Sequence, residues 1–203
     1  MIISFRWFGP ADPVPLAYVR QIPGVRGVVS AVYDVPVGEV WPRHKLDRLA
    51  GDVADAGLEL SVIEIVDRPA NGVTFCTGSL GVHPANDLPA MIRDLGGRRR
   101  IHFMHCRNVR RTGDKRFEES PHPSAFGDVD MFAVIDALLD VGFEGPMRPD
   151  HGRMIWGETG RPGYVLHDRA LGATYLEGLW EGASRSRRPA SHPRAGARHT
   201  GSP

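Results

Sequence analysis

Net charge, cysteines and long hydrophobic segments are all scarce in this chain. Its 203 residues include 25 lysines and arginines against 24 aspartates and glutamates, which gives a formal net charge of +1. Without a strong field of one sign, neither nucleic acid nor a membrane surface is indicated as a partner. No segment approaches the roughly 20 apolar residues of a membrane span, and the N-terminus has no basic stretch followed by an apolar one. We therefore expect a soluble, cytoplasmic protein.

Two cysteines are too few for a disulfide framework. Cys76 and Cys106 each end a strand-like run, a position that suits either a reduced thiol or a metal ligand. Two common kinds of site are missing as well. The stretches GSLG and GGR match no phosphate-binding glycine loop, and there is no serine nucleophile elbow.

Strand-like and helix-like runs alternate along most of the chain. The strand-like runs are mostly apolar, as buried parallel strands are, and cover residues 2–8, 25–32, 58–66, 72–76, 101–107 and 145–148. Helix-like patterns follow most of them, at residues 13–21, 41–56, 86–95, 130–141 and 168–180. This alternation predicts a parallel α/β architecture, either a barrel or an open doubly wound sheet.

The placement of polar residues favours the barrel, because barrel active sites are built at the C-terminal ends of the strands. Five such residues lie at or just after predicted strand ends: Asp34, Cys76, His105, Asn108 and Asp150. We expect residues 1–182 to form one catalytic domain. Residues 183–203 have no apolar period and are rich in arginine, serine, proline and glycine, which predicts a disordered basic tail.

Three strand ends carry side chains that bind metals: Cys76 in TFCTGS, His105 in FMHCRN and Asp150 in RPDHGR. A thiolate, an imidazole and a carboxylate at one barrel mouth would bind manganese, iron or zinc rather than calcium. Each residue also has an ordinary interpretation. Cys76 would serve as a small buried hydrophobe, His105 as a core histidine and Asp150 as a helix cap. Their common position at one end of the strands favours the metal site.

Three further residues are candidates for contact with a substrate. Arg107 and Asn108 suit an anionic or polyhydroxylated ligand, since arginine binds carboxylates well. Tyr164 lies just before the last helix-like segment, where it would either reach the same mouth or pack as an aromatic on a loop.

Seven segments of the chain, in this order, resemble mannonate dehydratase: FRWFGPADPVPL, GVVSAVYDVPVGEVWP, FCTGSLG, IHFMHCRNV, GDVDM, RPDHGR and PGYVLHDRALGATYLEGL. The resemblance runs from residue 2 to about residue 181. It implies a (β/α)8 barrel that dehydrates D-mannonate to 2-keto-3-deoxy-D-gluconate in hexuronate breakdown, with Mn²⁺ or Fe²⁺ as cofactor. On this resemblance Cys76, His105 and Asp150 match metal ligands, while His151 and Tyr164 match residues that move protons.

The resemblance also implies that a central section is missing between about Glu64 and Val66. In the family, a long section separates the segments that resemble ELSVIE and VDRPANGVTFCTGS, whereas here they are joined directly. That section would carry about two βα units, a substrate-covering insertion and an HPDD stretch whose histidine is a fourth metal ligand. The residues between the two apolar runs, at 67–71, contain a proline and an Asn-Gly pair and predict a turn. We therefore expect an incomplete TIM-type barrel of about six of the eight strand-helix units.

Two functional hypotheses follow. The first is a metal-dependent mannonate dehydratase, a hydro-lyase acting on a sugar acid and impaired by the internal deletion. The second is a catalytically inactive remnant, or a fragment that binds a partner through its exposed strands. The sequence leaves open a homo-oligomer.

Overall fold

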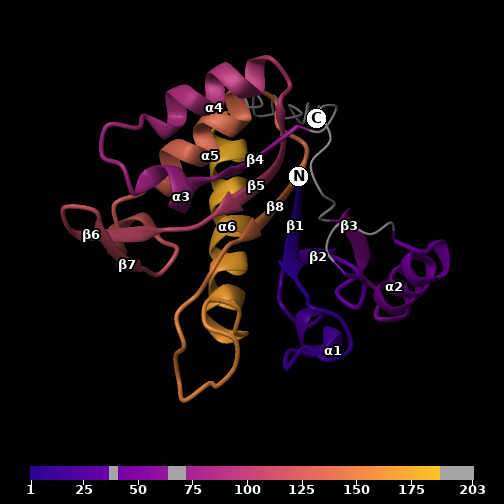
Figure 1. Cartoon of the computed structure of the whole chain (residues 1–203). Helices are drawn as coiled ribbons and strands as arrows, with labels where there is room; N and C mark the ends of the chain where they lie inside the picture. Colours follow the sequence, from indigo (N-terminus) through magenta and orange to yellow (C-terminus); the bar gives the residue numbers. More distant parts are fainter. Residues whose placement is uncertain (37–40, 64–71, 188–203) are drawn as a thin grey trace, which may run out of the picture.

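The computed structural model describes residues 1–36, 41–63 and 72–187. Their main feature is a six-stranded sheet in which all paired neighbours are parallel (Figure 1). The strands in spatial order are β3 (Glu59–Ile63), β2 (Val25–Ser30), β1 (Ile2–Arg6), β8 (Pro146–Pro149), β5 (Ile101–Cys106) and β4 (Val73–Cys76). The predicted parallel α/β architecture is confirmed, and each of these strands falls within a run that the sequence indicated or extends past it by one residue.

The strand order is that of a ring opened at one place. On one side of β1 the strands run in chain order through β2 to β3. On the other side they run in reverse chain order through β8 and β5 to β4, so that β3 and β4 form the outer edges of the sheet. Parallel neighbours are normally joined by a crossover of a dozen or more residues, but only residues 64–72 lie between β3 and β4. The described part of the chain is therefore a TIM-type barrel short of two strands. The predicted turn at 67–71 and the predicted junction from Glu64 to Val66 lie outside the described residues.

Four long helices accompany the sheet: α2 (Arg43–Asp55), α4 (Leu88–Gly97), α5 (Met131–Asp140) and α6 (His167–Ser186). α6 lies against β1 and β8, α5 packs between α6 and α4, and α2 packs beside β3 (Figure 1). Two short helices, α1 (Leu16–Val19) and α3 (Thr77–Gly81), follow β1 and β4. None of the helices within the described residues combines the length and apolar character needed to cross a bilayer.

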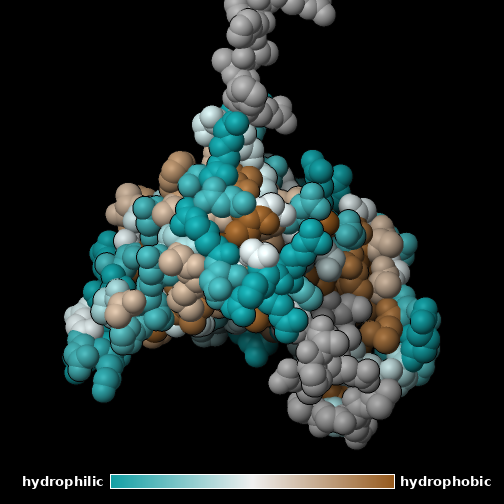
Figure 2. Space-filling view, turned by 90° about the horizontal axis from the view of Figure 1, so that it is seen from above, coloured by the Kyte–Doolittle hydropathy of each residue, from teal (hydrophilic) through white to brown (hydrophobic). Residues whose placement is uncertain are grey.

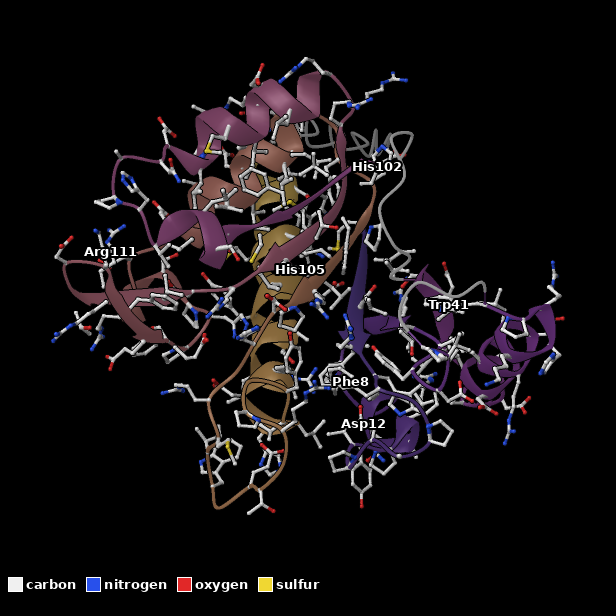
Figure 3. All side chains as sticks on the ribbon, viewed as in Figure 1. Phe8, Asp12, Trp41, His102, His105 and Arg111 are labelled. Carbon is white, nitrogen blue, oxygen red and sulfur yellow. The ribbon has the colours of Figure 1, made fainter. Side chains whose placement is uncertain are left out.

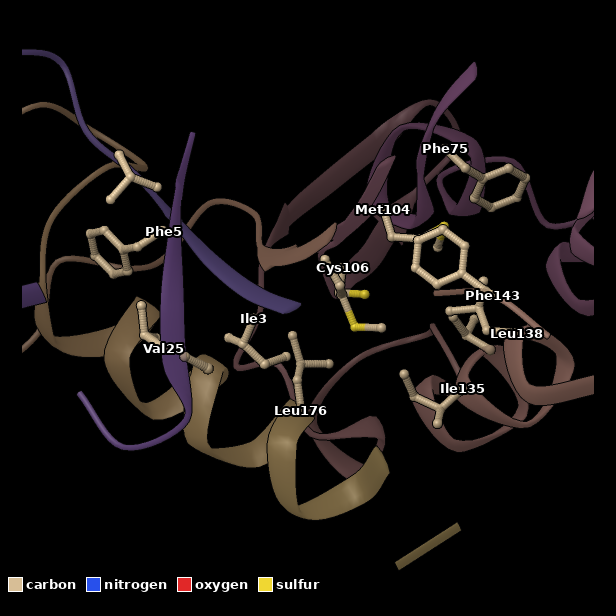
Figure 4. Packing of buried hydrophobic residues seen from close by; sticks show 14 of the residues in the cluster. Ile3, Phe5, Val25, Phe75, Met104, Cys106, Ile135, Leu138, Phe143 and Leu176 are labelled. Carbon is tan, nitrogen blue, oxygen red and sulfur yellow. The ribbon is translucent and has the colours of Figure 1, made fainter. Parts of the chain in front are cut away.

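The core lies between the sheet and the helices. Ile3 of β1 packs near Leu176 of α6, and Met104 of β5 lies beside Phe143 and Leu138 (Figure 4). Full burial of an aliphatic or aromatic side chain of this size contributes roughly 1.5–3 kcal/mol. The face of the molecule seen from above is mainly hydrophilic, with hydrophobic residues showing between the polar ones (Figure 2).

On the other face of the sheet, which would line the inside of a barrel, two serines come together. Ser4 of β1 and Ser61 of β3 meet with their hydroxyl oxygens 2.8 Å apart. They can do so because β2 places Gly27 between them, where an added Cβ would lie 2.2 Å from Oγ of Ser61 and 2.5 Å from Oγ of Ser4. A hydrogen bond between side chains therefore links β1 and β3 across β2 on this face.

Two features differ from the sequence-based predictions. α6 continues to Ser186 with Ala183 buried, so residues 183–186 of the predicted tail are helical, and residues 188–203 lie outside the described residues. The last turn is held because the Arg187 guanidinium pairs with Asp136 and, at 2.8 Å, with Asp140 of α5. A two-stranded antiparallel hairpin was also missed, formed by β6 (Val109–Gly113) and β7 (Arg116–Glu119).

Candidate metal and proton-transfer site

Three elements bring Cys76, His105 and Asp150 together at the C-terminal ends of the strands. Cys76 ends β4, His105 lies near the end of β5 and Asp150 directly follows β8. One donor atom from each residue lies within 4.8 Å of the others. The Cys76 sulfur is 3.7 Å from Oδ2 of Asp150, and Nδ1 of His105 is 3.5 Å from the same oxygen. Figure 3 shows His105 on the middle of the sheet, between the two outer groups of elements.

Local structure fixes the direction of the Cys76 thiol. Cys76 is the N-cap of α3, where its sulfur accepts hydrogen bonds from the backbone N–H of Ser79 at 3.4 Å and the Ser79 hydroxyl at 3.2 Å. The buried Thr77 hydroxyl donates to the carbonyl of Arg107 at 2.7 Å and accepts from its N–H at 2.8 Å. The ends of β4 and β5 are thereby tied to each other.

The Asp150 carboxylate is buried and ionised. Its Oδ1 lies 2.7 Å from Nη2 of Arg148, a side chain that is itself 2% exposed. Burial alone would raise the pKa of Asp150, but the hydrogen bond from His105 and the charge of Arg148 outweigh it and hold the pKa well below its usual range. A negatively charged oxygen therefore faces the thiol and the imidazole.

The three donors suit a transition-metal ion, because one sulfur, one nitrogen and one carboxylate oxygen converge from three rigid elements. Cys106 differs. It is fully buried on the helix side of β5, and burial raises the pKa of its thiol far above the usual range. Of the two cysteines, only Cys76 is placed as a ligand.

His151, the residue after Asp150, has a strained backbone and two polar partners. Its φ of 58° lies in the left-handed region, which non-glycine residues rarely adopt and which is often found at functional sites. Nδ1 of His151 lies 3.0 Å from Oε1 of Glu119, and Nε2 lies 3.3 Å from the hydroxyl of Tyr164. The two predicted proton-transfer residues are thus in direct contact, and Glu119 from the β6–β7 hairpin completes a chain of three groups.

Tyr164 is fixed by the loop that precedes α6. The buried Arg169 donates to the carbonyl of Tyr164 at 2.5 Å and to the carbonyl of Arg6 at 3.2 Å. The ring of Phe8 meets the Tyr164 ring edge-on, with centroids 5.1 Å apart. Next to Tyr164, Gly163 has a φ of +81°, and an added Cβ there would stand 3.2 Å from Nδ1 of His151. The loop and the imidazole are therefore closely packed.

The two predicted substrate-binding residues lie nearby but are engaged within the protein. The Arg107 guanidinium pairs with both carboxylate oxygens of Glu119, with Nε at 3.0 Å from Oε2. Asn108 is 1% exposed, donates to the carbonyls of Pro121 at 3.1 Å and Pro123 at 3.0 Å, and accepts from the N–H of Val129 at 3.0 Å. These hydrogen bonds give the Asn108 side chain a structural task, and its contact with substrate stays a prediction. Asn108 is buried because the chain segment after β7 folds over it.

Asp34, also expected at a strand end, lies apart from the cluster. Its carboxylate accepts from Nζ of Lys45 at 2.7 Å. Both residues line a cavity of about 460 Å³ that also includes Phe8 and Tyr33. Because Phe8 contacts Tyr164, this cavity adjoins the proton-transfer residues.

Sequence reasoning missed Glu119, Arg148 and Arg161. Glu119 belongs to a charged hairpin with no apolar run, and Arg148 lies inside a predicted strand. The Arg161 guanidinium carbon lies 4.4 Å from the Phe8 ring centroid and 5.9 Å from that of Tyr164. The signal for Arg148 and Arg161 was present in the motifs RPDHGR and RPGY, in which an arginine precedes Asp150 by two positions and Tyr164 by three.

Comparisons with known proteins identify the family of this chain. The model of the family D-mannonate dehydratase (UxuA) matches residues 1–68 and 62–189. The chain belongs to the mannonate dehydratase family. Mannonate dehydratase 2 of Halalkalibacterium halodurans is 32% identical over 344 aligned positions, which cover 91% of this chain and 100% of the relative. The crystal structure of mannonate dehydratase from Streptococcus suis serotype 2 has a TM-score of 0.86 and 28% identity, and covers 100% of this chain and 99% of that chain.

This member of the mannonate dehydratase family is internally shortened. Its 203 residues cannot fill 344 aligned positions, so the alignment with the first relative leaves long gaps in this chain. The mannonate dehydratase of Enterococcus faecalis is 53% identical over 141 residues, 70% of this chain but 38% of the relative. The two matches to the family model overlap at residues 62–68 of this chain. This is where the sequence indicated the missing section.

Proposed function

We propose that this chain carries the metal and proton-transfer groups of a mannonate dehydratase that converts D-mannonate to 2-keto-3-deoxy-D-gluconate. The observation that carries the proposal is the convergence of Cys76, His105 and Asp150 beside the hydrogen-bonded pair of His151 and Tyr164. The three donors would hold Mn²⁺ or Fe²⁺. When bound, the ion supplies Lewis-acid stabilisation of the negative charge that develops on substrate oxygens.

The reaction requires one proton to leave and another to arrive. The proton on the carbon next to the carboxylate is removed, and the neighbouring hydroxyl leaves as water after it accepts a proton. The resulting enol then becomes the keto acid. His151 and Tyr164 share the base and acid roles, since they are in contact with each other and His151 directly follows Asp150 of the cluster.

Arg161 is the residue that we propose for the substrate carboxylate. Arg107, Arg148 and Arg153 each pair with a carboxylate of the protein. Arg161 is exposed, and its guanidinium lies over the rings of Phe8 and Tyr164. A planar guanidinium at this position would bind a carboxylate through two hydrogen bonds and orient the adjacent carbon toward the proton-transfer pair.

The missing central section leads us to propose impaired turnover. The family resemblance places a fourth ligand, a histidine, in that section. Loss of a direct ligand should cost more than the 10–100-fold that accompanies the loss of groups supporting a ligand. We therefore expect weak manganese binding and slow conversion by this chain alone.

The test is an assay of 2-keto-3-deoxygluconate formation from D-mannonate with manganese, run beside the His151→Ala variant. Turnover that disappears in His151→Ala supports the proposal. A well-folded, manganese-loaded protein without turnover would contradict it.

The second candidate is an inactive remnant that binds a partner chain. It is favoured by β3 and β4, which have no further strand paired at their outer edges among the described residues. Unpaired strand edges readily accept another chain. Size-exclusion chromatography of this chain mixed with a full-length homologue tests it, since a stable complex without turnover would favour the remnant.

A further inference from the structure

The two ring nitrogens of His151 have different partners, and the partner of Nδ1 is the carboxylate of Glu119. Glu119 lies at the end of β7, a strand outside the main sheet, and its Oε1 is 3.0 Å from Nδ1 of His151. Both oxygens of this carboxylate are also held by the guanidinium of Arg107. The Arg107 side chain in turn crosses α3 at Gly78, where an added Cβ would lie 2.3 Å from its Cδ. Glu119 is thus fixed from two directions.

Glu119 is ionised in this position. Partial burial would raise its pKa, but the hydrogen bonds from His151 and Arg107 and the charge of Arg107 outweigh it, so that the pKa lies below its ordinary value. An ionised carboxylate can only accept hydrogen bonds. The ring nitrogen that faces it must therefore carry a proton.

We infer that Glu119 is a positioning residue that keeps the imidazole proton of His151 on Nδ1 and leaves the lone pair of Nε2 facing Tyr164. In the neutral ring one nitrogen donates while the other accepts. With Nδ1–H donated to Glu119, the Tyr164 hydroxyl at 3.3 Å donates to Nε2. His151 then receives a proton at Nε2 and passes none through Nδ1.

This inference makes Nε2 of His151 a proton acceptor and the Tyr164 hydroxyl a donor to it. The catalytic consequence rests on the proposed function. Nε2 of His151 is the atom that accepts a proton, either from Tyr164 or from substrate. Without the carboxylate, the ring is free to carry its proton on Nε2, where it can no longer act as a base. The tautomer itself can be measured without substrate, metal or turnover.

The test is long-range ¹H–¹⁵N NMR of protein labelled with ¹⁵N-histidine, at a pH where the ring is neutral. The His151 signals are identified by their absence from His151→Gln. We expect the Nδ1–H tautomer in the wild type, and a mixture or the Nε2–H tautomer in Glu119→Gln and Glu119→Ala. The matched control is Glu118→Gln, because Glu118 is exposed and lies on the other face of β7. Its spectrum should match that of the wild type.

Two results would overturn the inference: an Nε2–H tautomer in the wild type, or an unchanged Nδ1–H tautomer in both Glu119 variants. Where turnover is measurable, Glu119→Gln should lower kcat by about 10²–10⁴-fold, the usual contribution of a positioned acid or base, and change KM little. Absent turnover in all variants would count against the proposed function and would leave the NMR result valid. Near-UV circular dichroism shows whether each variant retains the fold.

Discussion

The ring of His122 lies against Gly172 of α6, so closely that an added Cβ at position 172 would stand 2.4 Å from Nδ1 of the imidazole. His122 is 2% exposed and cannot move toward solvent without opening the packing between its loop and α6. A glycine inside a long helix normally weakens the helix. Here it makes room for a buried ring.

Two glycines of α6 should therefore respond in opposite ways to substitution by alanine. Gly172→Ala should lower the free energy of unfolding by about 1–3 kcal/mol, because the methyl group overpacks the site of His122. Gly178→Ala should raise it by up to about 1 kcal/mol, because no atom lies within 4 Å of its added Cβ and alanine is the better helix former. Urea unfolding measures both, and equal effects of the two substitutions would refute the contact.

The stability of the protein should depend on the charge of His122. Burial lowers the pKa of His122 to about 4, although the charges of Asp168 and Asp150 act in the opposite direction. In the unfolded chain the imidazole titrates near pH 6.5. Between these two values the unfolded chain binds a proton that the folded protein does not bind. The free energy of unfolding should therefore fall as the pH drops from about 6.5 toward 4, by up to ~1.4 kcal/mol per pH unit.

The variant His122→Phe isolates this contribution, because it keeps a planar ring and removes the titrating group. Carboxylates present in both proteins cancel in the difference between the two stability curves. The wild type should lose stability more steeply in this pH range. Parallel curves from urea unfolding at several pH values would show that His122 does not carry the effect.

Asn108 should matter for stability rather than for substrate affinity. Asn108→Ala removes the hydrogen bonds of a buried side chain and leaves two carbonyls and one N–H without this partner. We expect a loss of about 2–4 kcal/mol in the free energy of unfolding. Asn86→Ala is the control, since Asn86 donates one exposed hydrogen bond to the carbonyl of Leu80, and it should cost less than about 1 kcal/mol. A fully stable Asn108→Ala with a raised KM would restore the substrate role.

Manganese binding should distinguish the two cysteines. Cys76→Ala removes one of the three clustered donors and should weaken Mn²⁺ binding at least about 10-fold. Cys106→Ala makes the same cysteine-to-alanine change at a buried thiol on the other side of β5. The affinity of this variant for Mn²⁺ should equal that of the wild type. Isothermal titration calorimetry gives both values. Equal weakening in the two variants would place the ion elsewhere.

Arg161 should affect substrate binding more than stability. We expect Arg161→Gln to raise KM for D-mannonate by about 10-fold or more, since a charge-assisted hydrogen bond contributes roughly 1.5–3 kcal/mol. Arg98→Gln is the control, because Arg98 caps the C-terminus of α4 and pairs with the exposed Asp94 of the same helix. An unchanged KM in Arg161→Gln would assign the carboxylate to another residue.

The strands and the convergence of three potential metal ligands could be predicted from sequence because local patterns specify them. Apolar β-branched runs mark the parallel strands, and parallel strands carry the residues at their ends to one edge of the sheet. This rule alone places Cys76, His105 and Asp150 together, although Cys76 and Asp150 are 74 positions apart.

The β6–β7 hairpin and the contacts that it makes could not be predicted in the same way. Its strands are short and charged, so they lack the alternation of apolar and polar residues by which a strand is identified in a sequence. The role of Glu119 depends on a contact with His151, 32 positions away, and on the fold of a loop. The burial of Asn108 could not be predicted either, because its place at a strand end gave no sign that the following loop would cover it.

The position of β8 in the sheet has a consequence for how the chain assembles during synthesis. β1, β2 and β3 form one group of paired strands, β4 and β5 form another, and β8 is the strand that joins them, pairing Met147 with both Ile3 and Met104. A nascent chain halted before residue 146 therefore holds two strand groups with no ladder between them. Both would remain sensitive to protease until the last strand leaves the ribosome, and pairing over so long a separation in sequence makes that final step slow.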